Sequence, residues 1–111
     1  MVHDILTAAG LTLNETYRKT RFPSPPSDKS YVVYMEDIDA EGADLRACIF
    51  THMVTVELYE PYPDDTTERA IEAALNKYVP EWTKQDRIWI ETEQLYQVVY
   101  EFDYITKEAL R

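Results

Sequence analysis

The chain has 111 residues, of which 11 are basic and 21 acidic, so its formal net charge is −10 and its pI lies near 4.5. This length suits a single domain over residues 1–111, with a radius of gyration of about 13 Å if it is compact. The negative charge argues against a protein that grips nucleic-acid phosphates, which takes clustered Lys and Arg. No apolar run approaches the roughly 20 residues of a transmembrane helix, and the N-terminus does not resemble a signal peptide. Cys48 is the single cysteine, which excludes an internal disulfide, so we expect a soluble protein of a reducing compartment with no membrane contact.

The first predicted element is a short helix over residues 2–9. Gly10 follows it at the place where a C-terminal cap is expected. The apolar residues at helical spacing are Val2, Ile5, Leu6 and Ala9. Three prolines between residues 21 and 28 exclude a helix and favour an extended, rigid loop there.

Two strand patterns predict an antiparallel hairpin. Residues 30–36 are rich in β-branched and aromatic side chains, and residues 46–59 alternate as a long strand does. The side chains expected on one face of the second strand are Phe50, His52, Val54, Val56 and Leu58. The intervening segment is expected to be a long acidic hairpin tip, whose carboxylates are Asp37, Asp39, Glu41 and Asp44.

A second helix and a second hairpin complete the predicted fold. The spacing of Asp65 and Glu68 matches a capping box, with Glu68 expected on the solvated side of the helix that Pro80 stops. The apolar stripe of this helix is Ala70, Ile71, Ala74, Leu75, Tyr78 and Val79. Residues 88–90 and about 95–104 read as strands, the last with an aromatic face made of Tyr96, Val98, Tyr100, Phe102 and Tyr104. The fold class is therefore α+β, a single antiparallel or mixed β-sheet with two helices packed on one face.

Each candidate catalytic or metal site lacks part of its pattern. The segment 37–42 places oxygens and a glycine as the EF-hand loop does, but its twelfth position is Cys48 instead of a glutamate. On a strand, Cys48 and His52 lie about 13 Å apart, too far to share a metal. Two glycines cannot build a phosphate-binding loop, and no serine stands in a nucleophile elbow. We therefore predict no catalytic, cofactor-binding or metal-binding residue, no cofactor and no enzyme, with a weak cation site in the acidic loop as an alternative.

The order and spacing of several segments carry a family resemblance. They are residues 31–34, 54–59, 63–65, 68–78 and 89–103. From about residue 3 to residue 107, the chain resembles the small tail-completion or tail-terminator proteins of long-tailed phages and prophages of Gram-positive bacteria. This resemblance implies a viral structural protein without catalysis, in a tail-terminator-like fold that assembles as a homo-oligomeric ring, commonly a hexamer. Such a ring caps the major tail tube protein and joins it to a head-closure or neck connector protein.

The same resemblance implies a virion location, in the neck or tail, with host cytoplasm as the site of assembly. DNA would pass through the ring without specific binding. In such a ring Asp37, Asp39, Glu41 and Asp44 are hypothesised to line the lumen or to meet a basic surface on a neighbouring ring, because like charge keeps DNA from adhering. Solubility alone is the other explanation of their charge.

Two other functions stay open at this point. A neighbouring neck or head-closure protein has a similar size and is the nearest alternative role in the virion. An acidic DNA mimic that inhibits a host nucleic-acid enzyme is the alternative from another class. Basic residues interspersed among the acids argue against mimicry; they are Arg18, Lys19, Arg21, Arg69, Lys77, Lys84 and Arg87.

Overall fold

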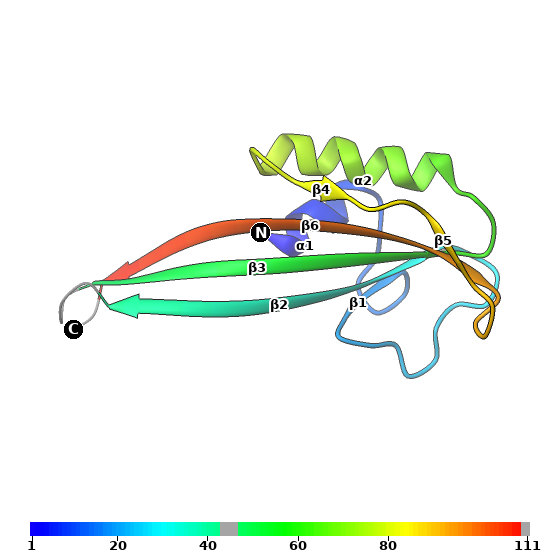
Figure 1. The fold of residues 1–111 in the computed structure, drawn as a ribbon, viewed down its shortest axis with the longest axis horizontal. Helices are drawn as coiled ribbons and strands as arrows, with labels where there is room; N and C mark the ends of the chain where they lie inside the picture. Colours follow the sequence, from blue (N-terminus) through cyan, green and yellow to red (C-terminus); the bar gives the residue numbers. More distant parts are fainter. Residues whose placement is uncertain (43–46, 110–111) are drawn as a thin grey trace.

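The computed structural model describes residues 1–42 and 47–109, with the side chains of residues 47, 48, 108 and 109 excepted. The elements in chain order are α1 (Val2–Ala8), β1 (Tyr17–Lys19), β2 (Tyr31–Gly42), β3 (Ala47–Glu60), α2 (Asp65–Tyr78), β4 (Thr83–Lys84), β5 (Ile88–Ile90) and β6 (Leu95–Ala109) (Figure 1). One mixed six-stranded sheet and two helices make up the α+β fold, which confirms the predicted class.

The sheet has the strand order β1-β2-β3-β6-β4, and β5 also pairs with β6. β1 runs parallel to β2, and every other pair is antiparallel. The hairpins predicted around β3 and around β6 are therefore confirmed. β1 and β4 were not predicted, because three and two residues are too few to show an alternating pattern.

Both helices lie on the same face of the sheet, where they contact each other (Figure 1). The core on this helix-covered face contains side chains of α1 and α2 and of even-numbered positions in β2, β3 and β6, as the alternation predicted. Its members include Val2, Ile5 and Leu6 of α1, Ile71, Ala74 and Leu75 of α2, and Val32, Tyr34, Val54, Val56, Leu58, Val98, Tyr100 and Phe102 of the sheet. In the part of the chain that the structure describes, the opposite, open face of the sheet carries no helix.

The ends of the helices follow local hydrogen bonding. Gly10 has φ +87°, its N–H donates to Thr7, and the N–H of Leu11 donates to Leu6, which is a Schellman C-cap as the glycine predicted. α2 begins at Asp65 and its N-cap is Asp64, so the predicted N-cap, Asp65, is wrong by one residue. Asp64 caps the helix because its carboxylate accepts three hydrogen bonds. They come from the Thr67 N–H (3.0 Å) and from the hydroxyls of Thr67 and Ser30 (both 2.7 Å).

Strands β2, β3 and β6 run far beyond the helices (Figure 1). The molecule measures 50 × 28 × 23 Å and its radius of gyration is 15.7 Å, larger than the compact shape predicted. We call residues 37–42, 47–53 and 103–109 the arm, and the helix-covered remainder the body. β2 was predicted to end at residue 36 and the last strand at about residue 104, which is wrong in both cases. Continuous pairing with β3 extends both strands, since polar side chains are tolerated where both faces meet solvent.

Among the described residues, neither helix is both long enough and apolar enough to cross a membrane.

Candidate functional site

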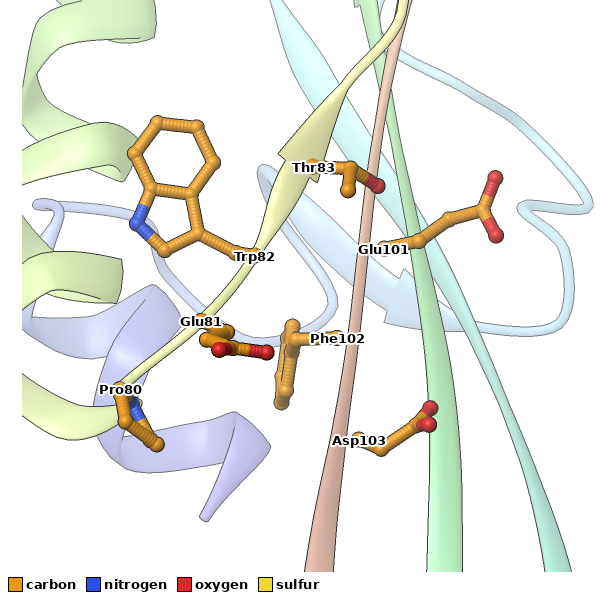
Figure 2. Close-up of a pocket in the computed structure, with 7 residues that line it drawn as sticks. All are labelled: Pro80, Glu81, Trp82, Thr83, Glu101, Phe102 and Asp103. Carbon is orange, nitrogen blue, oxygen red and sulfur yellow. The ribbon is translucent and has the colours of Figure 1, made fainter.

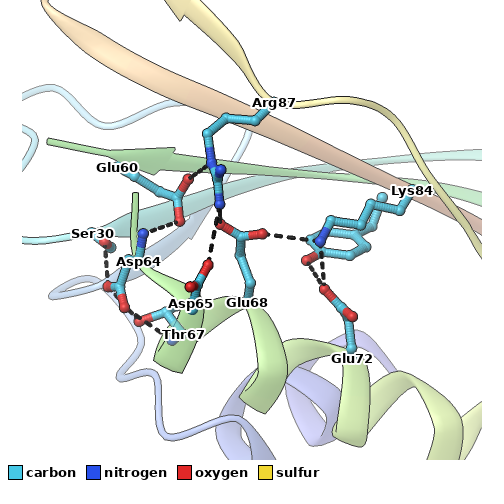
Figure 3. A network of polar contacts seen from close by, with 10 residues as sticks. Ser30, Glu60, Asp64, Asp65, Thr67, Glu68, Glu72, Lys84 and Arg87 are labelled. Atoms are coloured by element: carbon cyan, nitrogen blue, oxygen red, sulfur yellow. Dashed lines mark hydrogen bonds and ion pairs between the residues drawn. The ribbon is translucent and has the colours of Figure 1, made fainter. Parts of the chain in front are cut away.

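A network of charged side chains joins α2 to the end of β3 and to the segment 84–87 (Figure 3). The guanidinium of Arg87 donates from Nε to Glu60 (3.2 Å) and from a terminal nitrogen to Glu68. Lys84 Nζ donates to Glu68 (2.9 Å) and to Glu72 (2.8 Å). Glu60 is 0% exposed and Glu68 is 4% exposed. The prediction that Glu68 lies on the solvated side of α2 is therefore wrong. The charge of Glu68 is tolerated inside because two cations contact it.

Burial has opposite outcomes at the two inner carboxyl groups. Burial, as the larger cause, and the adjacent Glu68 carboxylate together raise the pKa of Glu60 to about 7. At Glu68 burial would also raise the pKa, but hydrogen bonds from Glu60, Arg87 and Lys84 outweigh it and hold the pKa below its usual range. A carboxyl pair with divided pKa values is an arrangement that acid–base catalysis uses. Here, however, the bonds of the pair go to Arg87, Lys84 and the Asp64 N–H, which ties three segments together.

A second polar cluster lies at the base of the arm and spans three strands. His52 Nδ1 lies 2.6 Å from Glu36, and its Nε2 lies 2.9 Å from the Thr106 hydroxyl. The Tyr104 hydroxyl donates to the same Glu36 oxygen (3.0 Å), and the Tyr104 ring stacks on His52 at 4.2 Å. Burial would raise the pKa of Glu36, but the bonds from His52 and Tyr104 outweigh it and lower the pKa. This cluster fixes β2, β3 and β6 to one another where the helices end.

The acidic residues predicted for a hairpin tip lie on a strand instead. Asp37, Asp39 and Glu41 belong to β2 and alternate with residues that face the helix side, so all three lie on the open face of the arm. They are exposed, and neighbours in the row are about 7 Å apart along the strand. Asp44, the fourth predicted residue, lies outside the described residues.

The extended backbone of this row argues against the weak cation site that was the alternative for the acidic segment. An EF-hand ligates its ion by wrapping a loop around it, whereas alternate residues of a straight strand cannot converge on one point. In the described part of the chain, no three or more His, Cys, Asp or Glu side chains are grouped to hold a metal. His52 instead bonds Glu36 and Thr106, and the side chain of Cys48 is not described.

A groove of about 690 Å³ opens at the outer edge of β6, beside β4 (Figure 2). It is lined by Pro80, Glu81, Trp82, Thr83, Glu101, Phe102 and Asp103. In Figure 2, Glu81 lies beside Phe102 on the helix side, while Glu101 and Asp103 project from the other side of β6. The groove was not predicted from the sequence. It arises because β4 pairs with β6 only at residues 83–84, and β6 then continues without a strand on that side among the described residues.

The comparisons with known proteins add a similarity of fold. No family model matches the chain, and no curated protein matches it either. Among solved structures, the chain is similar to one chain of the virion of a native gene transfer agent (GTA) particle, with a TM-score of 0.55 and 13% sequence identity. The match covers 94% of this chain and 84% of that chain. At this identity the similarity shows a shared fold, across the body and the arm alike.

Proposed function

We propose that this protein is a structural subunit of a phage-like particle, and more specifically a tail-terminator or tail-completion protein. The observation that carries the proposal is the fold shared over 94% of the chain with a chain of the GTA virion. Independently, the segments described above resemble tail-completion proteins in order and spacing. In this role the protein is not an enzyme, and its location is the neck or tail of the virion.

The shape of the subunit supports a role in assembly. An arm of three strands leaves the body with both faces uncovered and both edges unpaired among the described residues. Open strand edges favour pairing with other chains, so a free monomer with such an arm is prone to association. In the proposed role the subunits form a ring, as a hexamer, that caps the tail tube and contacts the neck connector protein.

The acidic row on the arm gives this ring a proposed inner surface. Asp37, Asp39 and Glu41 stand on one face of β2, and Asp44 follows them in the sequence. Facing a channel, this row would repel the phosphate backbone and let DNA pass without adhering. Facing a neighbouring ring, it would bind a basic surface.

The proposal is tested by mixing the purified protein with the major tail tube protein of the same genome. We expect rings by light scattering, or caps at the ends of tubes by negative-stain electron microscopy, and tubes that stop growing. A protein that stays monomeric and leaves tube ends bare would contradict the proposal. If that monomer competes with duplex DNA for a nuclease, the DNA-mimic function is the better one.

The acidic row is tested separately, in particles made from a genome that lacks this gene. The variant Asp37→Asn, Asp39→Asn, Glu41→Gln and Asp44→Asn is compared with a control that neutralises Glu15, Asp28, Asp86 and Glu93 in the body. We expect the first variant to lower DNA delivery and the control to leave it unchanged. Normal tail joining and delivery by the arm variant would leave these residues with solubility as their role.

A further inference from the structure

The two ends of the sheet carry opposite charges. β1 is the strand at one end, and Arg18, Lys19 and the nearby Arg21 are exposed along it; we call these three the basic edge. No ion pair between described residues involves any of the three. The chain has only 11 basic residues, so three within four positions form a local excess on a protein of net charge −10. The positive charges of this edge are therefore available to form ion pairs with acidic groups outside the subunit.

The other end of the sheet is the groove beside β4 and β6. Glu81, Glu101 and Asp103 are exposed there and take part in no ion pair among the described residues; we call these three the acidic edge. Trp82 and the largely buried Phe102 supply an apolar floor (Figure 2). Beyond Glu101 the outer side of β6 also has backbone groups that no described strand pairs with. The groove thus combines charge, apolar surface and an open strand edge.

The two edges lie at the same level along the strands. Lys19 pairs with Tyr34, Tyr34 with Val56, and Val56 with Tyr100, the neighbour of Glu101. Tyr100 pairs in turn with Lys84 of β4, whose charge is taken up within the subunit by Glu68 and Glu72. One continuous row of the sheet therefore runs from the basic edge to the acidic edge. A copy rotated about an axis parallel to the strands would bring its basic edge to the height of this copy's groove.

The two edges also match face by face. Arg18 pairs with Val33, so it stands on the open face, where Glu101 and Asp103 project from β6. Lys19 pairs with Tyr34 of the core, so it stands on the helix side, where Glu81 lies. Arg18 and Lys19 therefore each meet carboxylates on their own face when two sheets lie edge to edge in the same orientation.

We propose that the basic edge of one copy docks in the acidic groove of the next, head to tail. A contact between two different patches on opposite ends of a subunit is heterologous, and repeated by rotation it closes a ring. The inference rests on the proposed function, to which it adds the subunit interface. A second copy is the occupant that fits, because Arg18 and Lys19 face carboxylates on both sides of the sheet and Arg21 adds to the positive charge of the same edge. A nucleic acid would meet the repulsive charge of the remaining acids.

Charge reversal tests the interface in the full-length protein. Variant one carries Arg18→Glu, Lys19→Glu and Arg21→Glu; variant two carries Glu81→Lys, Glu101→Lys and Asp103→Lys. A control reverses three exposed cations elsewhere, Lys29, Arg69 and Lys77, and so changes the net charge as variant one does. Assembly is followed by light scattering and electron microscopy, with and without the tail tube protein. Thermal unfolding checks that each variant is folded.

We expect each reversed variant alone to need at least about a tenfold higher concentration to assemble, and the control to assemble like wild type. An equimolar mixture of variants one and two should regain assembly, because each reversed edge then faces an opposite one. Higher salt should weaken wild-type assembly, since it screens exposed charges.

Reversed variants that assemble like wild type would overturn the interface and leave the ring intact. The interface would also be overturned if the equimolar mixture of variants one and two failed to assemble while the control assembled. If wild type itself neither assembles nor caps tubes, the failure is that of the proposed function and the interface falls with it. The two failures are therefore distinguishable.

Discussion

The body and the arm are built from the same three strands, yet they meet opposite conditions. In the body, β2, β3 and β6 place Val32, Leu58 and Val98 side by side under the helices, where each is fully buried. In the arm, the same strands carry Ile38 at 54% and Ile105 at 62% exposure. The body is thus stabilised by contacts within the chain, whereas the arm has backbone pairing and little burial. This difference supports the proposal that contacts outside the subunit complete the arm.

The comparison is sharpest for apolar side chains. Replacing Leu58 with Ala removes a fully buried side chain from beneath the helices, which we expect to lower the free energy of unfolding by about 2–5 kcal/mol. The matched change Ile105→Ala in the arm should cost less than about 0.5 kcal/mol. Urea denaturation of both variants measures the two values. Equal losses would show that the arm is packed as tightly as the body.

A smaller effect is expected where charge holds the body together. Arg87→Ala leaves the buried carboxyl groups of Glu60 and Glu68 with one fewer cation, and we expect a loss of about 2–3 kcal/mol. Arg69→Ala, at an exposed position of α2, is the matched control and should change little. Chemical denaturation at neutral pH makes the measurement. If both variants unfold alike, the network does not hold α2 to the strands.

The pH dependence should differ in sign between Glu60 in the body and Glu36 at the base of the arm. The raised pKa of Glu60 favours its protonated form in the folded protein, so its stabilisation is complete below about pH 4.5 and is lost as the pH rises through about 7. The lowered pKa of Glu36, at the base of the arm, stabilises above about pH 4.5 and its contribution is lost on further acidification.

Denaturation from pH 4 to 8 of wild type and of single Glu→Gln variants isolates each group. Glu60→Gln should gain stability relative to wild type as the pH rises from about 4.5 to 7. Glu36→Gln should approach wild type as the pH falls below about 4.5. Glu15→Gln, at an exposed site, controls for removal of a carboxyl group. A Glu60→Gln difference that stays flat or shrinks across this range would contradict the stated environment of Glu60.

The cap of α1 should contribute about 1 kcal/mol. Gly10→Ala forces a side chain into a positive φ of +87°, and a Cβ there would meet nothing within 4 Å, so the cost is conformational strain alone. Gly10→Asn should cost less, because asparagine tolerates this region. Thermal unfolding of the two variants gives the comparison. An alanine variant as stable as wild type would mean that the helix end shifts to another cap.

The smallest effect on folding is expected in the arm itself. Ile38→Ser changes a side chain that lies beyond the helices, so the free energy of unfolding should shift by less than about 0.5 kcal/mol. The same variant should weaken assembly with the tail tube protein, as judged by electron microscopy. Unchanged assembly together with a marked loss of stability would reverse the roles assigned to arm and body.

The sequence predicted the body well because buried positions recur with the period of the helix or strand that carries them. The stripe of α2 and the alternation of β3 each correspond to residues that are buried together. The arm was predicted too short because its strands carry solvent-tolerant residues on both faces. Asp37 and Asp39 read as loop residues by propensity, and only pairing across β3 makes them part of a strand.

The functional surfaces were predicted in part. The acidic residues were identified, but their arrangement as a row on one face depends on the longer β2. The groove could not be predicted, because it requires knowing that β4 stops after two residues while β6 continues. The basic edge is visible in the sequence as three cations in four positions, yet its place at one end of the sheet depends on the unpredicted β1.

The pairing of Ala47 with Ala109 has a practical consequence for handling the protein. A fusion that directly follows Ala109 would start at the far end of the arm, whereas one added before Met1 would start beside the body, next to α1 (Figure 1). A tag at the first place would crowd the part of the molecule that we propose makes contacts, and a tag at the second would crowd the part that holds the core. Labels at the two ends therefore act as separate reporters, one of docking and one of unfolding.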